Sequence, residues 1–252
     1  MIDDGAQHIY AHKKETLQNL PAHVGIIMDG NGRWAQCRGM ARTQGHLEGL
    51  KAARKIVEAA SNFGIRYLTL FVFSTENFKR SEMEIDFIMS LVKKHLMREI
   101  DFYKQNKLRI RHAGDTNGLR ADIIAELKEA QTDTKDFTGM QVVLALNYGG
   151  RAEIIRAVKR IVKQQIDSGD FCSDNFDEDL ISYNLDNPDI PAPDLIIRTA
   201  GEYRLSNFLL WQAAYSEIFI SPVLWPDWSE ECLFEALKDY AKRERRFGAV
   251  TK

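Results

Sequence analysis

The 252-residue chain has few of the features that mark secreted, membrane-spanning and zinc-stabilised proteins. Its three cysteines, Cys37, Cys172 and Cys232, are scattered and form no CxxC pair, so we expect neither a disulfide framework nor a cysteine-ligated zinc site. No apolar run approaches the length of about 18 residues that a membrane span needs. The first residues also do not follow the basic and then apolar pattern of a signal peptide. These absences fit a cytoplasmic protein whose membrane contact, if any, is peripheral.

The chain also has little net charge. Its 34 basic and 36 acidic side chains leave a formal net charge of −2, so no global field would recruit nucleic acid, and no nucleic-acid partner is expected. The composition, 44% hydrophobic and 28% charged, is ordinary for a globular protein. At this length we expect a single domain over residues 1–252, with a lead-in at 1–20 and a C-terminal tail at 245–252.

What the sequence does contain is an alternation of strand and helix patterns. Apolar, β-branched and aromatic runs predict strands at residues 23–29, 67–73, 109–114, 140–147, 194–199 and 217–220. Helices are predicted at residues 43–62, 81–105, 119–128, 151–168 and 229–246, and Ser81 and Glu84 predict a capping box. Strands separated by helices predict an α/β fold, with a central, mainly parallel sheet of about six strands covered by helices on both faces.

The stretch from residue 24 to residue 35 carries the strongest chemical signal. A short apolar strand pattern ends at Asp29, and Gly30 and Gly32 then allow a tight loop that can approach a ligand closely. Strand, glycine loop and helix form the usual frame of a phosphate site, but a carboxylate repels phosphate unless a cation lies between them. Three basic residues follow: Arg33, Arg42 and His46. We therefore predict a metal-bridged phosphate or diphosphate, the alternative being an ordinary strand–turn–helix unit with a solvated aspartate.

Polar residues also follow three other predicted strands. They are Ser74 to Asn77, Asn147 and Arg198. The carboxyl ends of parallel strands meet at one edge of a sheet, and ligands bind there in open α/β sheets. We therefore expect these groups to converge with Asp29.

The residues after Arg198 predict a second anion site. Arg198, Arg204 and Ser206 supply two guanidinium groups and a hydroxyl, and guanidinium groups match phosphate oxygens geometrically. The alternative is that the arginines pair with surface carboxylates such as Glu202.

A dinucleotide site is a weaker interpretation of the glycine loop. Residues 30–35 match the pattern GxGxxA, but that fingerprint needs an acid about 20 residues later, at the end of a second strand. Here the position falls near Ala52, inside a predicted helix, and the next strand begins only at Tyr67. We therefore do not expect a dinucleotide-binding Rossmann domain.

Five segments resemble, in the same order, the motifs of the cis-prenyltransferases, the Z-isoprenyl diphosphate synthases. They are residues 23–35, 73–80, 147–153, 194–202 and 204–217, and the resemblance covers about residues 21–248. It implies a Mg²⁺-dependent enzyme that condenses isopentenyl diphosphate onto an allylic diphosphate such as farnesyl diphosphate, forming cis double bonds. It further implies a long-chain product of the undecaprenyl class, the lipid-carrier precursor for cell-wall synthesis. The DDxxD motifs of trans-prenyltransferases do not occur in the sequence.

The resemblance also implies roles for individual residues. Asp29 would hold Mg²⁺, and Glu217 would complete the metal site. The allylic diphosphate would be bound by Gly30, Asn31, Gly32, Arg33, Arg42 and His46, with Trp34 in the same pocket. A mobile segment with Ser74, Thr75, Glu76, Asn77, Phe78 and Arg80 would close over the site. Asn77 would serve catalytic proton removal, although an amide is a poor base and is better interpreted as a positioning group or relay. Isopentenyl diphosphate would be bound by Arg198, Arg204 and Ser206.

The chain departs from the family pattern at three positions. Phe78 and Ser81 stand where bacterial members commonly have Trp and Pro, and Ala200 stands where Ser or Gly is usual. The first two bear on closure of the mobile segment and on product length. The ending Arg245-Arg-Phe-Gly248 is similar to the Arg-x-Gly ending of the family, which implies a homodimer.

Product length is the property that the sequence specifies least. A growing chain needs an apolar tunnel, and its predicted wall is the face of the 81–105 helix with Ile85, Ile88, Met89, Val92 and Leu96. Strands 67–73 and 140–146 would line the rest; ordinary core packing is the alternative for the helix face. Two other functions stay open, a shorter-chain synthase and a noncatalytic binding subunit, although such subunits lack the aspartate motif found here.

Overall fold

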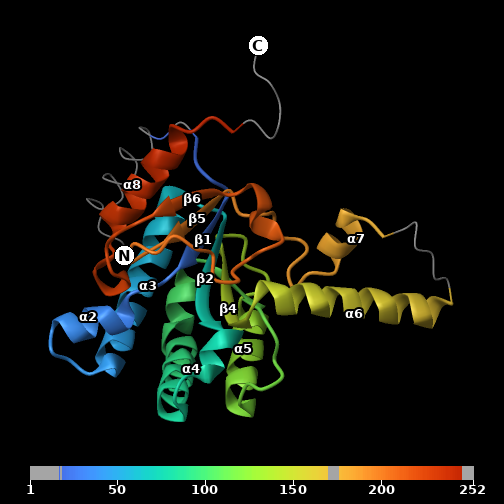
Figure 1. The fold of residues 1–252 in the computed structure, drawn as a ribbon, viewed down its shortest axis with the longest axis horizontal. Helices are drawn as coiled ribbons and strands as arrows, with labels where there is room; N and C mark the ends of the chain where they lie inside the picture. Colours follow the sequence, from blue (N-terminus) through green and yellow to red (C-terminus); the bar gives the residue numbers. More distant parts are fainter. Residues whose placement is uncertain (1–16, 18, 170–175, 246–252) are drawn as a thin grey trace.

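The computed structural model describes residue 17 and residues 19–169 and 176–245, and six strands in these ranges form one parallel sheet. Their order is β3-β4-β2-β1-β5-β6 (Figure 1). Their bounds are β1 His23–Ile27, β2 Tyr67–Ser74, β3 Arg109–Ala113, β4 Gln141–Tyr148, β5 Leu195–Arg198 and β6 Glu217–Ile220. The predicted parallel sheet is confirmed, and its carboxyl ends all lie at one edge. Most of the predicted lead-in and tail lies outside the described residues.

The helices follow the prediction closely in their positions. Their bounds are α2 Asn31–Cys37, α3 Arg42–Phe63, α4 Glu82–Gln105, α5 Ala121–Asp133, α6 Gly150–Ser168, α7 Glu178–Tyr183 and α8 Glu230–Ala241. Short 3₁₀ turns form η1 Thr75–Lys79, η3 Gln212–Tyr215 and η4 Trp225–Asp227. Two predicted ends are wrong: the helix expected at residues 119–128 continues to Asp133, and the last helix ends at Ala241.

The predicted glycine loop is shorter than expected. Gly30 alone makes the turn, with a φ of 110°, and α2 begins directly after it at Asn31. The turn needs glycine because side chains rarely adopt that backbone conformation. The loop prediction was therefore correct for Gly30 and wrong for residues 31–35.

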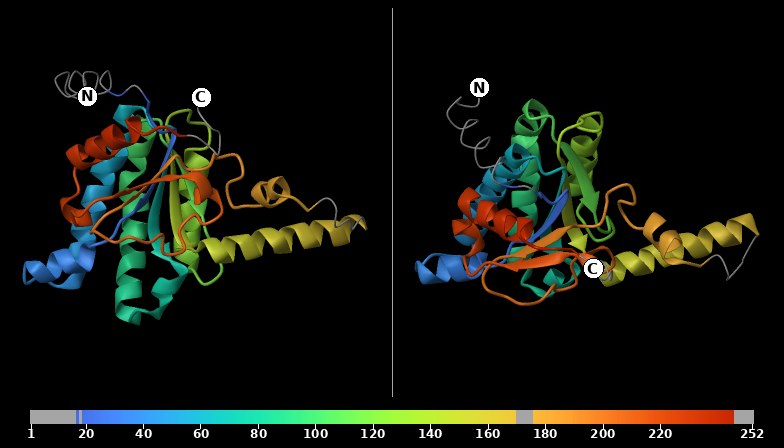
Figure 2. Two further views of the ribbon diagram at one scale, coloured as in Figure 1. Left: turned by 45° about the horizontal axis from the view of Figure 1, so that its top comes forward. Right: turned by 90° about the horizontal axis from the view of Figure 1, so that it is seen from above.

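The two faces of the sheet are covered differently. α3, α4 and α5 stand side by side on one face, where Ile56 and Leu96 join the main core (Figures 1 and 2). A smaller cluster on the other face contains Phe208 and Leu209, from the irregular segment that follows β5. α6 projects away from the body of the molecule (Figure 2). The second face is thus covered largely by irregular chain, where the sequence predicted a layer of helices.

Strand β2 contains a bulge near its carboxyl end. Phe71 pairs with Ala145, Phe73 with Leu146 and Ser74 with Tyr148. Val72 is therefore extra in β2, and Asn147 is then extra in β4, which restores the register at Ser74. An extra residue in one strand bends it and redirects the side chains that follow. The bulge lies immediately before Ser74, which begins the predicted mobile segment.

In the described part of the chain, no helix combines the length and the apolar character that crossing a membrane requires.

Candidate active site

Asp29 and Arg198 form an ion pair at the carboxyl edge of the sheet. β1 and β5 are neighbours with Ile27 opposite Arg198, so Asp29, just beyond β1, reaches the arginine with Nη2 and Oδ2 2.9 Å apart. The Arg198 side chain is 4% exposed and that of Asp29 is 34% exposed. The predicted convergence of these two strand ends is confirmed.

Arg198 has more donor capacity than the protein uses. Its Nη1 donates to Ser206 Oγ at 2.8 Å and to the carbonyl oxygen of Arg204. Its Nε is buried and has no hydrogen-bond partner among the described residues. A buried donor without an acceptor typically costs about 1–3 kcal/mol. An anion with several oxygens would relieve that cost, which is the behaviour expected of a phosphate-binding arginine.

A polar cavity of about 220 Å³ opens beside this ion pair. Eight of the residues predicted for the site line it: Asp29, Asn31, His46, Ser74, Asn77, Arg80, Arg198 and Ser206. They come from the ends of β1, β2 and β5, from the first turns of α2 and α3, from η1 and the residue after it, and from the segment that follows β5. The structure therefore brings together residues that are up to 177 positions apart in the sequence.

Glu84 of α4 gathers the basic residues on one side of the cavity. Its Oε1 lies 2.9 Å from Arg80 Nη1, 3.2 Å from Arg42 Nε and 3.3 Å from His46 Nε2. Burial raises the pKa of Glu84, but Arg80 and Arg42 outweigh it and hold that pKa below its ordinary value. Burial also lowers the pKa of His46. The cations that the sequence predicted for a diphosphate are thus held by an internal carboxylate.

This arrangement explains why the predicted capping box is only half formed. Ser81 Oγ accepts from the Glu84 backbone N–H at 3.4 Å, as expected. The Glu84 carboxylate points to the basic residues, where the capping box would have it return to the helix N-terminus.

Glu202 likewise holds two other arginines of the predicted site, Arg33 and Arg204. It lies 2.9 Å from Arg33 Nη2 and accepts a hydrogen bond from Arg204 Nη1. That hydrogen bond, helped by the charges of both arginines, lowers the pKa of Glu202. Pairing of Arg204 with Glu202 is the alternative that the sequence left open, whereas Arg198 pairs with Asp29.

Side-chain hydrogen bonds of Thr75, Glu76 and Asn77 hold segment η1 in place. Asn77 Oδ1 accepts from the Ser74 backbone N–H at 3.0 Å, which caps η1 and leaves the amide NH₂ available. Glu76 Oε1 accepts from Asn207 Nδ2 at 2.8 Å, and Thr75 Oγ1 donates to Glu76 Oε2 at 3.1 Å. Phe78 is 39% exposed and packs edge-on against Phe73. Asn77 therefore has the geometry of a positioning group, as interpreted from the sequence.

The segment from Ala200 to Leu209 has an unusual backbone. Five of its residues have positive φ angles, including Ala200 at 70° and Ser206 at 49°. Such angles favour glycine, because a Cβ is crowded in that backbone conformation. Backbone strain of this kind persists only where surrounding structure enforces it, and it often marks ligand sites.

Three predicted residues do not lie where the sequence suggested. Glu217 begins β6 at the amino edge of the sheet, opposite Leu195, and its Oε2 accepts from Arg243 Nη1 at 2.7 Å. Through β5 it is level with Val24, so Asp29 is five residues farther along, about 16 Å at the usual strand rise. Within one chain, Glu217 therefore lies apart from Asp29, and its predicted part in the metal site stays a prediction.

Trp34 and Asn147 are the other two. The Trp34 indole donates from Nε1 to Asp227 Oδ1 at 2.7 Å and stacks under Arg38, outside the polar cavity. Asn147 reaches the expected edge, but its Nδ2 donates to the carbonyl oxygens of Asp115 and Asn117, each at 2.9 Å. Asn147 holds a loop and does not line the cavity.

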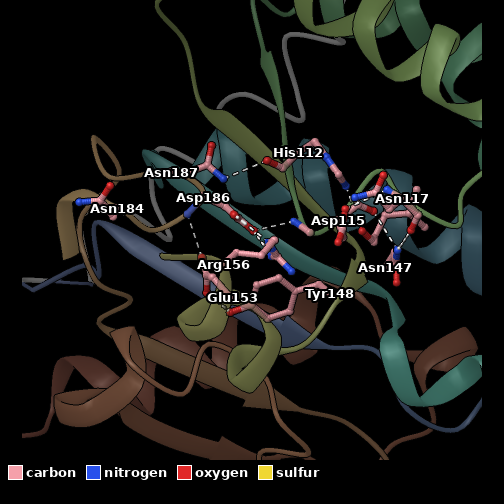
Figure 3. Close-up of polar contacts among 12 residues, drawn as sticks. His112, Asp115, Asn117, Asn147, Tyr148, Glu153, Arg156, Asn184, Asp186 and Asn187 are labelled. Atoms are coloured by element: carbon pink, nitrogen blue, oxygen red, sulfur yellow. Dashed lines mark hydrogen bonds and ion pairs between the residues drawn. The ribbon is translucent and has the colours of Figure 1, made fainter. Parts of the chain in front are cut away.

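The residues after Asn147 belong to a network of polar contacts (Figure 3). Tyr148 Oη donates to buried Glu153 at 2.5 Å, and the backbone N–H of Asp186 donates to the same carboxylate at 3.1 Å. Asp186 in turn pairs with Arg156 at 2.5 Å. These bonds join the end of β4, the start of α6 and the segment before β5 into one rigid unit.

Sequence reasoning missed Glu84 and Asn207. The sequence predicted Glu84 as a helix cap. Its ionic partners lie up to 42 positions earlier in the sequence, too far for a local pattern to indicate them. Asn207 contacts η1 and also accepts from the Arg151 backbone N–H at 2.9 Å, so it links three elements. The one sequence feature that could have indicated a role for Asn207 is its position between Ser206 and a hydrophobic run.

A second, apolar cavity of about 110 Å³ continues from the polar one. The two share six lining residues: Met28, Asn31, His46, Phe71, Val72 and Ile88. Of the predicted wall of α4, Ile88, Val92 and Leu96 line the apolar cavity, whereas Ile85 and Met89 do not. Leu70 of β2 and Leu144 of β4 line it from the sheet, as predicted. A charged mouth and an apolar interior suit a molecule with a charged head and an apolar chain.

The oxygen atoms at the mouth fit Mg²⁺ bound mainly through a substrate. No group of three or more His, Cys, Asp or Glu side chains that could hold a metal occurs among the described residues. Mg²⁺ commonly uses one or two carboxylates and completes its shell with water and phosphate oxygens. Asp29 supplies one carboxylate, and the buried Oδ1 of Asn31 in the same cavity has no partner there.

Comparisons with known proteins agree with this geometry. Residues 27–248 match the family model described as "Putative undecaprenyl diphosphate synthase". An isoprenyl transferase from Treponema denticola is 48% identical over 90% of this chain and 96% of its own. A ditrans,polycis-undecaprenyl-diphosphate synthase ((2E,6E)-farnesyl-diphosphate specific) from Vibrio vulnificus is 45% identical over 92% of each chain.

Solved structures show the same fold. The lavandulyl diphosphate synthase from Lavandula x intermedia, in complex with dimethylallyl diphosphate, aligns with a TM-score of 0.87 at 35% identity, covering 93% of this chain and 99% of that one. A probable undecaprenyl diphosphate synthase from Campylobacter jejuni aligns with a TM-score of 0.77 at 34% identity, covering 92% and 100%.

Proposed function

Because the chain belongs to the undecaprenyl diphosphate synthase family and is a prenyltransferase, we propose that it elongates farnesyl diphosphate with isopentenyl diphosphate. The proposed product is a long-chain cis-polyprenyl diphosphate of the undecaprenyl class, a lipid-carrier precursor for cell-wall synthesis. The observation that carries the proposal is the pair of joined cavities, one lined by Asp29 and Arg198 and the other apolar.

The allylic diphosphate is assigned to the side of the cavity formed by α2 and α3. The assigned residues are Gly30, Asn31, Gly32, Arg33, Arg42 and His46. The absence of a Cβ at Gly32 leaves room for the Arg42 guanidinium, because a Cβ there would lie 3.1 Å from Arg42 Nε. The diphosphate must displace Glu84 from Arg42 and His46, so binding exchanges one anion for another. The predicted contact of Trp34 with substrate stays a prediction.

Isopentenyl diphosphate is assigned to Arg198, Arg204 and Ser206. Arg198 and Ser206 line the polar cavity, and the unpartnered Nε of Arg198 offers a donor. Arg204 must leave Glu202 to join them. Two anionic substrates then lie side by side, which the cationic side chains make possible.

Asp29 is the residue assigned to Mg²⁺, which when bound would neutralise the departing diphosphate. The arginines stabilise the same charge as the allylic carbon–oxygen bond breaks. A carbon–carbon bond then forms between the allylic carbon and isopentenyl diphosphate, which gives up a proton to the released diphosphate and so restores a double bond. Asn77, fixed by its bond to Ser74, positions the groups at that step. Arg80, Glu76 and Thr75 belong to the segment proposed to close over the site.

The apolar cavity is proposed to receive the growing chain. Each buried CH₂ contributes about 0.8 kcal/mol, so every added unit strengthens binding until the apolar space ends. We further propose a cytoplasmic enzyme that contacts the inner membrane face peripherally when it releases product. A shorter-chain cis-prenyl diphosphate synthase is the second candidate, favoured by the small volume of about 110 Å³.

A homodimer is part of the proposal. Arg245, the first residue of the predicted tail, donates to Asp194 Oδ1 at 2.5 Å, and residues 246–252 lie outside the described range. β6 is an edge strand, and Ile218 on it is 46% exposed, as expected of a surface that a second copy covers. Sedimentation at assay concentration tests this, and an active monomer would refute it.

The deciding experiment is a product analysis. Purified full-length protein is incubated with farnesyl diphosphate, isopentenyl diphosphate and Mg²⁺, and the dephosphorylated products are separated by chromatography. A ladder of cis-polyprenols ending near the undecaprenyl length is expected. A product that stops at three to five isoprene units would replace the long-chain proposal by the shorter-chain one. Folded protein that releases no diphosphate would favour the noncatalytic binding subunit.

A further inference from the structure

His95 is a polar residue at the inner end of the apolar cavity. Ile88 lines both cavities, and His95 follows it seven positions later on α4, which places it about 10 Å deeper along the helix. Ala53 of α3 and Leu144 of β4 line the same cavity. A chain that enters from the charged mouth would therefore reach Ile88 first and the His95 imidazole after it.

The His95 ring is held from below by a buried aromatic group. Its Nε2 lies 3.1 Å from Tyr103 Oη, and the two rings meet edge to face with centroids 6.0 Å apart. Tyr103 is 1% exposed and packs against Phe102, on whose ring the Arg54 guanidinium lies. The His95 ring thus has a fixed position, which an ordinary flexible wall residue would lack.

Both members of the pair are uncharged at neutral pH. Burial lowers the pKa of His95 to about 4, and the nearby Arg54 charge acts in the same direction. Burial likewise raises the pKa of the Tyr103 hydroxyl. The contact is therefore a neutral hydrogen bond in apolar surroundings, and a hydrocarbon chain that separated the two groups would offer neither of them a new partner.

We propose that His95, held by Tyr103, is a chain-length-determining residue that restricts the inner end of the cavity. This inference rests on the proposed function. A chain longer than the cavity passes only when the ring leaves Tyr103 or α4 moves away from α3. The pair thus sets how often elongation continues beyond this point.

Three variants test the proposal against product length. His95→Ala removes the ring and should shift the distribution to longer products by about one five-carbon unit or more, because it enlarges the cavity. His95→Trp should shift it to shorter products. Tyr103→Phe keeps the volume but removes the hydrogen bond, and should shift it in the same direction as His95→Ala by a smaller amount. Lys94→Ala, on the exposed side of the same helix, is the matched control and should leave the distribution unchanged.

The outcomes separate this inference from the proposed function. If wild-type protein makes no polyprenyl product, the proposed function fails first. If wild type elongates but His95→Ala and His95→Trp, both folded by circular dichroism, give the wild-type distribution, the assignment of His95 is refuted. If only the total turnover of the variants falls while the distribution is unchanged, His95 is a packing residue and the proposal is equally overturned.

Discussion

Polar groups lie at both ends of strand β1, but the two ends differ in whether these groups have hydrogen-bond partners. At the amino end, His23 is 3% exposed, and both of its ring nitrogens are bonded, to Pro191 O at 2.6 Å and to Thr69 Oγ1 at 2.8 Å. Since a proline carbonyl can only accept, Nδ1 carries the proton and Nε2 accepts from Thr69. The backbone N–H of His23 donates to Asp194 at 3.1 Å.

At the carboxyl end, donors and acceptors are left over. Asp29 meets Arg198, yet Arg198 Nε and Asn31 Oδ1 are buried without partners among the described residues. Around them Glu84 and Glu202 hold cations that a stronger anion could take over. The comparison shows that the satisfied end of the strand stabilises the fold, whereas the unsatisfied end keeps its polar groups for a ligand.

The largest effect is expected at the unsatisfied end. Asp29→Ala should lower turnover by about two to three orders of magnitude, because preorganised charge stabilisation is lost. The fold should persist, since Asp29 contributes no core packing. Steady-state diphosphate release, with circular dichroism as the check on folding, measures this. Turnover within a few-fold of wild type would remove Asp29 from the metal site.

The satisfied end should respond to pH through stability. Burial lowers the pKa of His23 to about 4, from 6.5 in the unfolded chain. As pH falls, the unfolded chain binds the proton first, so stability is lost between about pH 6.5 and pH 4, by roughly 3 kcal/mol for this group. Urea unfolding of wild type and His23→Gln across this range gives the His23 share by difference. A difference that does not change with pH would show that His23 does not titrate as described.

The two halves of the charged mouth should separate by substrate. Arg198→Ala should raise the KM for isopentenyl diphosphate by about tenfold or more, since a charged hydrogen bond contributes about 1.5–3 kcal/mol, whereas Arg42→Ala should act on the allylic substrate. Arg204→Ala should act on isopentenyl diphosphate with a smaller effect than Arg198→Ala, because the Arg204 side chain is 57% exposed and that of Arg198 is 4% exposed. Arg33→Ala should act on the allylic substrate, as Arg42→Ala does. An Arg204 variant whose only defect concerned the allylic substrate would reverse the assignment.

The smallest effect is expected where the satisfied end meets the tail. Arg245→Ala removes the partner of Asp194 Oδ1 and should lower the free energy of unfolding by about 1 kcal/mol, the scale of a partly exposed ion pair. Lys242→Ala, on the exposed surface nearby, is the control. If Arg245→Ala abolished activity without any loss of stability, the residue would act on the site or on assembly.

Much of this comparison could be predicted from the sequence. Asp29 and Arg198 each end an apolar run, and parallel strands bring such ends to one edge, so their meeting follows from the pattern alone. Glu217 shows the converse: it begins its apolar run, which places it at the opposite edge, and this signal was outweighed by motif similarity.

Other features could not be predicted because they depend on tertiary contacts. The ionic partners of Glu84 come from a different helix and from η1, and the contact between Asn207 and Glu76 joins residues 131 positions apart. The cover of the second sheet face was also missed, because Phe208 and Leu209 lie in a segment without regular periodicity. Pattern reasoning detects regular elements, and this part of the core has none.

The extra residue Val72 in β2, which Asn147 offsets in β4, ties the length of that strand to the chemistry at its end. Phe71 and Val72 both line the apolar and polar cavities, and β2 ends two residues later at Ser74, directly before η1. Side chains alternate along a strand, so removing one residue here would turn every later side chain to the opposite face. A surface loop can tolerate an insertion or a deletion. In this strand, the same change would exchange the side chains that face the cavity for those that face the core. Under the proposed function, the strand is a fixed spacer between the diphosphate head and the prenyl tail of one substrate molecule.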